Sequence, residues 1–213
     1  MGKASNANGW CAGTLVGPRH LLTASHCIDW TIDANGNAGW LIFQPDFYDT
    51  DVFPSAYAIK YFTYQQGPYP LTAASLAIDY TVVVLNERLG DQLQYLGIKD
   101  YDQSWDNGMY WSHVGYPTDV GGGAKPAFEG SSETIVAAIS QDNGQGDNLE
   151  TFMSTNHGDS GGPVFGWWGS DNPMPYVVGV CSAEGTLNGI NANWFAGGPG
   201  MADLVNQALS EFP

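Results

Sequence analysis

Length, composition and charge already exclude several classes of protein. The chain has 213 residues, 43% of them hydrophobic and 13% aromatic, so it can bury a real core in one large domain or two small ones. Its formal net charge of -16, from 22 acidic residues against 6 Lys and Arg, repels phosphate backbones and anionic membranes. We therefore expect neither a nucleic-acid nor a membrane partner.

Short apolar runs separated by Gly, Pro, Asn and Asp predict a many-stranded β protein. The predicted strands, in chain order, are Gly13–Val16, Trp40–Phe43, Ala56–Phe62, Thr81–Leu85, Met109–Gly115, Thr134–Ile139, Thr151–Ser154, Val164–Trp167 and Tyr176–Cys181. Only the tail, Gly200–Leu209, has the apolar spacing of an amphipathic helix, which we expect to cap the fold. The polar segment Leu89–Asn107 separates two groups of strands, so we place two β lobes at 1–95 and 96–213.

The segment 157–163, with the sequence HGDSGGP, places a serine among glycines. A serine hydroxyl becomes a useful nucleophile when a neighbouring base takes its proton, and donors must surround the oxygen that becomes negative. Gly158 and Ser160 can point their amides into one oxyanion hole, while Gly161 and Gly162 permit a tight turn. A chance match to GDSGGP in a chain of this size is an event of about one in 10,000 or rarer. We therefore predict Ser160 as the nucleophile.

Two further segments supply a candidate base and a candidate acid. In the segment 21–27, LLTASHC, an apolar strand ends in small residues and delivers His26. In the segment 76–85, LAIDYTVVVL, Asp79 directly precedes a strand that is apolar enough to be buried. Burying an unpaired carboxylate is costly, so Asp79 needs a partner such as an imidazole, although an Asp that caps a strand is the alternative.

The other histidines lack such a setting. We expect His20 and His113 to be surface residues or satisfied structural ones. The role of His157 stays open: it adjoins the serine, and one alternative is that it lines the cleft without transferring protons. Three cysteines allow at most one internal disulfide and leave one thiol. Asp46, Asp49 and Asp51 form an acidic cluster that is compatible with calcium, but a solvated loop is the expectation for so acidic a chain.

The three segments occur in the order His, Asp, Ser, and together they resemble the chymotrypsin and trypsin superfamily of serine proteases. The motifs Gly115-Tyr116-Pro117 and Asn193-Trp194-Phe195, with the short C-terminal helix, resemble its glutamyl-endopeptidase-like bacterial and fungal branch. The resemblance implies an all-β fold of two antiparallel six-stranded barrels with the triad in the crevice between them. It also implies a disulfide between Cys11 and Cys27, which requires an oxidising compartment.

The resemblance further implies a substrate pocket. Its walls would be Ser154, Thr155 and Asn156 on one side and Ser182, Ala183 and Glu184 on the other, with Ser182 also supporting Asp79. Relatives that cut after Lys or Arg have an acidic residue where this chain has Ser154, and those that cut after Glu have a histidine where it has Cys181. Glu184 leaves two alternatives: a pocket that attracts basic side chains, or a small neutral pocket if its carboxylate faces solvent.

Two departures from the family pattern bear on the site. Only ten residues precede Cys11, so either upstream residues were removed or the first barrel closes differently. Met1–Asn8 also lacks the hydrophobic core of a secretion signal, so we expect a processed form or an expression product. In trypsin-type enzymes a freed N-terminal amine pairs with the Asp before the serine, and this chain has no such start. The partner of Asp159 is therefore open.

These residues predict a secreted, extracellular serine endopeptidase, a monomer acting on protein or peptide substrates through an acyl-enzyme with His26, Asp79 and Ser160. We expect no cofactor and no metal. The first alternative is a non-catalytic binding or effector protein of the same fold, and the second is an enzyme that acts mainly on esters.

Overall fold

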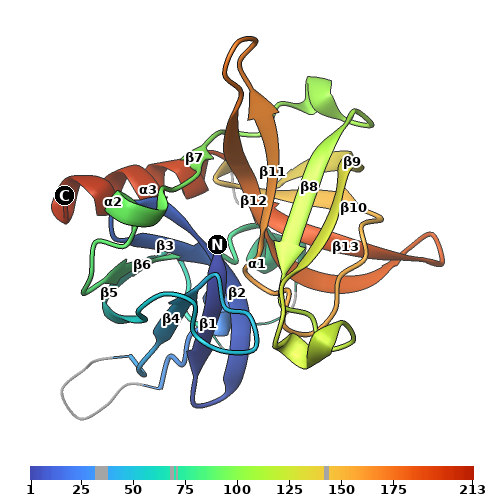
Figure 1. Ribbon diagram of the computed structural model, residues 1–213. Coiled ribbons are helices and arrows are strands. Elements are labelled where there is room, and N and C mark those ends of the chain that lie inside the picture. The colour runs from blue at the N-terminus through green and yellow to red at the C-terminus, as the bar shows by residue number, and fades with distance from the viewer. Residues whose placement is uncertain (32–37, 68–69, 71, 142–143) are drawn as a thin grey trace.

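Two β-barrels lie side by side in the computed structural model, which describes residues 1–31, 38–67, 70, 72–141 and 144–213 (Figure 1). The first barrel is closed, in the order β1-β2-β3-β6-β5-β4, and its neighbouring strands are antiparallel. Its strands are β1 (Gly2–Asn6), β2 (Gly9–Gly17), β3 (His20–Thr23), β4 (Ile42–Pro45), β5 (Ala56–Thr63) and β6 (Thr81–Leu85).

The second barrel runs β11-β8-β9-β10-β13-β12 and is closed by pairing between β11 and β12. Its strands are β8 (Met109–Gly115), β9 (Ala127–Gln141), β10 (Gly146–Thr151), β11 (Pro163–Trp168), β12 (Met174–Leu187) and β13 (Ile190–Gly197). The short β7 (Gly97–Ile98) adds to β12 in parallel. The predicted fold class, two antiparallel six-stranded barrels, is confirmed.

Helices are few and short apart from the last. They are α1 (Ala73–Ala77), α2 (Gly90–Leu93) and α3 (Pro199–Glu211), with 3₁₀ turns η1 (Ser25–Cys27), η2 (Gln103–Trp105) and η3 (Gly121–Gly123). The predicted tail helix is thus confirmed. The strand predicted at Thr151–Ser154 is wrong: β10 ends at Thr151, because the Met153 amide donates to the Thr151 hydroxyl and turns the chain out of the ladder.

Strand β1 closes the first barrel by pairing with both β2 and β4. Although only ten residues precede Cys11, β1 pairs with β2 over five positions and with β4 over four. At Gly2 strands β1 and β4 approach so closely that a Cβ would collide with the backbone of Gln44 and Pro45. Five residues therefore suffice to join the two edges.

The run TVVVL forms strand β6, and none of its residues faces solvent. Val83 and Leu85 pack into the core of the first barrel with Leu15 and Phe43. Val82 and Val84, on the opposite face, belong to a second core at the junction of the barrels. Both faces of β6 are therefore buried. A polar residue at the start of this strand consequently lies inside the molecule, at the junction of the barrels.

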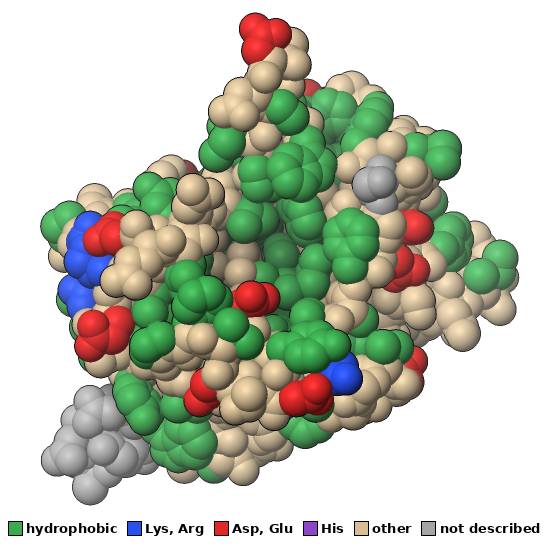
Figure 2. Space-filling view, viewed as in Figure 1, with side chains coloured by type: hydrophobic (Ala, Val, Ile, Leu, Met, Phe, Trp, Pro, Cys, Tyr) green, Lys and Arg blue, Asp and Glu red, His purple; other side chains and the backbone are tan. Residues whose placement is uncertain are grey.

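Helix α3 covers that junction. Its Met201, Leu204, Val205 and Ala208 pack with residues of both barrels, including Val82 from β6. None of the helices in the described part of the chain has the length and apolar character needed to cross a bilayer. On the face seen in Figure 2, acidic side chains are scattered and Lys and Arg gather mainly at one edge, so this face has no broad basic patch.

Replacing Leu204 with Ala should lower the free energy of unfolding by about 2–5 kcal/mol, because it opens a cavity where the two barrels meet α3. Urea unfolding followed by tryptophan fluorescence measures this loss. The exposed Asn206→Ala on the same helix is the control and should change stability by less than about 0.5 kcal/mol. Equal losses in both variants would contradict the role assigned to α3.

Candidate active site

Asp79 is a completely buried carboxylate at the junction of the barrels, just before β6. Three donors compensate its charge: the backbone N–H of His26 at 2.9 Å from Oδ1, the imidazole Nδ1 of His26 at 2.6 Å from Oδ2, and the Ser182 hydroxyl at 2.7 Å from Oδ2. Its donors come from η1 in the first barrel and β12 in the second. The predicted partners of Asp79, an imidazole and Ser182, are both in contact with it.

His26 projects from η1, a turn fixed by its neighbours. The side-chain amide of Asn6 donates to the Cys27 carbonyl at 2.8 Å, and the Trp30 indole donates to the Ser25 carbonyl at 2.8 Å. Burial lowers the pKa of His26, but the hydrogen bond and charge of Asp79 outweigh it and raise the pKa above its ordinary value. Because Nδ1 is held by Asp79, Nε2 is the nitrogen left for proton transfer.

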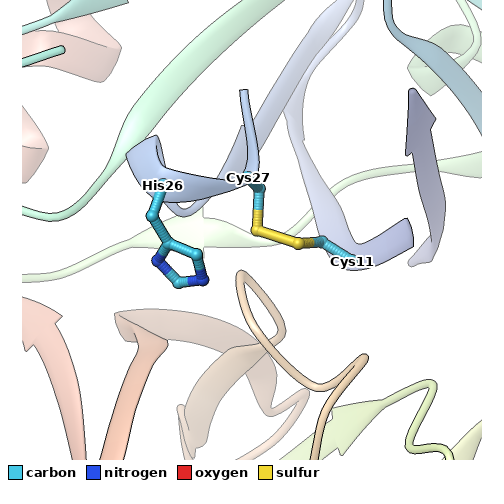
Figure 3. A group of neighbouring side chains, drawn as sticks. All are labelled: Cys11, His26 and Cys27. Carbon is cyan, nitrogen blue, oxygen red and sulfur yellow. A yellow bond between two sulfur atoms is a disulfide. The ribbon is translucent and has the colours of Figure 1, made fainter. Parts of the chain in front are cut away.

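A disulfide joins Cys11 on β2 to Cys27 on η1, as predicted. Figure 3 shows that the disulfide and the His26 ring lie on the same side of η1. The three side chains are close enough together to hold a metal ion, but both sulfurs are already bonded to each other and offer no thiolate. The group is therefore a covalent clamp on the turn that carries His26.

The loop that carries Ser160 is anchored to both barrels. The Ser160 carbonyl accepts the Ala12 amide of β2 at 2.8 Å, while the Gly161 amide donates to the Cys181 carbonyl of β12 at 2.8 Å. Gly161 has a φ of +77° and packs so tightly against Thr23 and Ala24 that no Cβ would fit. Since these two residues lead directly into His26, the serine and histidine segments are in contact.

Two amides of this loop differ from their neighbours. The N–H groups of Asp159, Gly161 and Gly162 all donate to backbone carbonyls. Within the described residues, the N–H groups of Gly158 and Ser160 have no acceptor. Gly158 has a φ of +100° and sits against the Tyr116 carbonyl, which itself accepts the Trp10 indole at 3.0 Å. These are the two amides that the sequence predicts for an oxyanion hole.

A pocket of about 510 Å³ is lined by the segment 152–155 and by strands β12 and β13. Ser154, Thr155 and Glu184 line it, as expected, together with Phe152, Met153, Gly185, Thr186, Asn191, Ala192 and Asn193. The sequence pattern did not predict the wall formed by β13, because it did not predict that strand. Of the other expected wall residues, Asn156 lines a different pocket and Ser182 is buried on Asp79, while Ala183 is not among the lining residues. Glu184 is exposed and is the single charged residue among those that line this pocket.

The remaining histidines and cysteine have distinct settings. His20 is buried and its Nε2 contacts the Ala208 carbonyl of α3 at 3.2 Å, which is a structural role. His157 is exposed beside the serine loop. Cys181 is a free, buried cysteine whose thiol pKa is raised by burial, as expected of a small hydrophobe. His113 is fully buried, and the sequence pattern predicted no role for it in the site.

Comparison with known proteins identifies the family. The trypsin family model matches residues 1–197. The chain belongs to the trypsin family. The predicted enzyme class, serine-type endopeptidase, is the class of this family. The resemblance inferred from the three segments is confirmed.

Two of the proteins that the chain resembles are glutamyl endopeptidases, the branch that the sequence motifs resemble. The chain is 28% identical over 187 residues to a glutamyl endopeptidase of Bacillus licheniformis, covering 87% of this chain and 54% of the relative, so it spans about half the length of that protein. A solved Glu endopeptidase superposes with a TM-score of 0.71 at 22% identity, covering 98% of this chain and 89% of the other. The thermostable serine protease AL20, from an extremophilic microorganism, gives 0.70 at 21% identity, covering 98% and 96%.

Replacing Asp79 with Asn should lower the pKa of His26, because the charge that raises it is removed and the effect of burial remains. Nitrogen-15 NMR titration of the four imidazoles, assigned with single His→Asn variants, measures the change. Asp203→Asn, an exposed position on α3, is the control and should leave that pKa unchanged. A His26 pKa unaffected by Asp79→Asn would contradict the coupling.

Proposed function

We propose that this trypsin-family chain is a secreted serine endopeptidase in which Ser160 is the nucleophile, His26 the general base and Asp79 the group that orients the base. The observation that carries the proposal is the contact of 2.6 Å between His26 Nδ1 and the buried Asp79. It fixes the tautomer in which Nδ1 bears the proton, so Nε2 has the lone pair that a base needs.

The reaction then proceeds in two balanced halves. Ser160 Oγ attacks the peptide carbonyl carbon, its proton passes to His26 Nε2, and the negative oxygen is bound by the amides of Gly158 and Ser160. When the carbon–nitrogen bond breaks, the imidazolium gives its proton to the leaving amine and an acyl-enzyme remains. Water repeats the sequence with His26 as base, which releases the acid and restores Ser160.

Protein or peptide substrates in an extracellular setting fit this chemistry. The Cys11–Cys27 bond needs an oxidising compartment to form and persist, which supports export. The chain's relatives named glutamyl endopeptidase and serine protease support a peptide substrate. We propose that the enzyme works as a monomer, without a cofactor or metal ion.

Fluorophosphonate labelling tests the nucleophile. We expect stoichiometric attachment at Ser160, located by mass spectrometry of the digested protein, and no attachment in Ser160→Ala or after prior denaturation. Ser160→Ala and His26→Ala should each lower kcat by several powers of ten. The exposed Ser210→Ala on α3 is the matched control and should keep full activity and labelling. A folded sample that is neither labelled nor active would favour the alternative of a binding protein.

The pH profile tests the base. Because the pKa of His26 is raised, kcat/KM should be low when the ring is protonated and should rise only above the ordinary histidine range. Initial rates on an uncharged peptide ester and on the matching peptide amide measure the profile for both substrates. Comparable profiles with good peptide turnover support an endopeptidase, whereas turnover confined to the ester would favour an esterase.

We propose that the pocket of about 510 Å³ prefers an uncharged side chain before the cut bond. Ser154, Thr155 and Asn193 offer neutral polar atoms, and the single carboxylate, that of Glu184, belongs to an exposed residue where solvent screens it. Digestion of a peptide library followed by mass spectrometry should give cuts after uncharged residues in the native enzyme and in Glu184→Gln. A strong preference for Lys or Arg that Glu184→Gln abolishes would contradict a neutral pocket.

A further inference from the structure

Asp159, the residue before Ser160, is a buried carboxylate. Within the described residues only one of its two oxygens accepts a hydrogen bond. Its exposed fraction is 4%. Oδ2 accepts the backbone N–H of Asn156 at 2.9 Å, whereas Oδ1 has no hydrogen-bond partner within the described residues. An unsatisfied buried carboxylate oxygen is costly and calls for a donor.

His113 on β8 likewise has a buried polar atom without a hydrogen-bond partner in the described residues. Its side chain is 3% exposed and its Nδ1 lies 3.0 Å from the Pro163 carbonyl, which can only accept, so Nδ1 carries the ring proton. Nε2 of the neutral ring is then an acceptor, and it too has no partner in the described part of the chain. It lies 4.0 Å from Asp159 Oδ1. At 4.0 Å the two acceptors are too far apart for a hydrogen bond in this conformation, so a proton can join them only after the side chains approach by about 1 Å.

We infer that Asp159 and His113 share one proton, and that this proton ties the nucleophile loop to β8. With the proton on Asp159 Oδ1, the carboxyl donates to His113 Nε2; with the proton on Nε2, the imidazolium donates to the carboxylate. In either position, one proton gives both Asp159 Oδ1 and His113 Nε2 a hydrogen-bond partner. His113 is thereby a positioning residue for the Gly158 and Ser160 amides, a role that rests on the function proposed above.

The surrounding backbone is shaped for this approach. A Cβ at Gly115 would collide with the Asp159 carboxylate, and one at Gly162 would collide with the His113 ring. On its other side the imidazole packs edge-on against Phe195 at 5.0 Å between ring centres. Both side chains are therefore held facing each other by glycines that admit them and an aromatic ring that backs them.

The charges around the pair favour a proton over a free carboxylate. Asp119 and Glu129 line the same pocket of about 240 Å³ with Asp159 and His113, and Cys181 of β12 lies close enough to interact with Asp159. No Lys or Arg in the described residues forms an ion pair with Asp159. Burial, reinforced by Asp119 and Glu129, raises the pKa of Asp159 to about 7, and burial lowers the pKa of His113 to about 4.

A loss of the shared proton would leave a buried negative charge with only one donor, directly beside Ser160. The enzyme would then have an alkaline limit of its own: kcat/KM rises as His26 loses its proton and falls as the Asp159–His113 pair loses its proton. Above that second ionisation the rate should fall by about tenfold for each pH unit, as expected for a single group.

NMR on the inactive Ser160→Ala protein tests the pair without reference to hydrolysis. The Asp159 side-chain ¹³C signal and the His113 ring ¹⁵N signals should move together over one pH range. In Asp159→Asn, whose amide can donate to Nε2, the ring should stay neutral and its shared titration should disappear. An Asp159 that titrates near pH ~4 independently of His113, or that stays ionised because the pocket takes up a cation, would overturn the inference.

Kinetics of paired His113 variants supply the second readout. In His113→Gln the amide can donate to Asp159 Oδ1, so we expect activity to be retained and the alkaline limb to vanish. In His113→Asn the shorter amide can replace Nδ1 at the Pro163 carbonyl but leaves Oδ1 without a donor, so kcat should fall by tenfold or more. Equal behaviour of the two variants, both folded by circular dichroism, would overturn the positioning role. Absence of activity in the native protein with a coupled NMR titration would instead refute only the proposed hydrolysis.

Discussion

The buried carboxylate of Asp79 is the constraint around which the molecule is organised. A charge that is completely removed from water is tolerable only with several donors, and Asp79 has three, drawn from both barrels. The junction of the barrels is therefore polar at one point and apolar around it, where Val82, Val84 and α3 exclude water. The arrangement of donors that stabilises the buried charge of Asp79 also orients the His26 ring.

The serine loop depends on that junction for its position. It has no regular structure of its own, so its geometry comes from Ala12 on one side, Cys181 on the other, and the close packing of Gly161 on Thr23. The Gly161 amide donates to Cys181 and the Gly162 amide donates to Asp159 within the loop, whereas those of Gly158 and Ser160 have no acceptor in the described residues. Preorganised donors of this kind cost little when charge develops, because they need not reorient.

The sequence predicted most of the fold, together with residues of the site that lie in contiguous segments. Alternating or continuous apolar runs such as Thr81–Leu85 identified the strands, and GDSGGP identified the loop with its two open amides. It did not predict β1 and β13: β1 is short and polar, and β13 carries Asn191 and Asn193, which line the pocket of about 510 Å³. The sequence also could not predict the role inferred for His113, because His113 and Asp159 come close only when β8 and the serine loop meet in the second barrel.

Asp79 and Asp159 represent two physical solutions to the same problem, within one site. Asp79 is compensated by three donors that the fold supplies, whereas Asp159 has one backbone donor, acidic neighbours and a neutral imidazole 4.0 Å away. A chain with 22 acidic residues and 6 Lys and Arg has few cations to place inside. A proton is the smallest cation that can fill this role. Its cost is pH dependence, because a bound proton, unlike a guanidinium, is lost in the range where the base must be neutral.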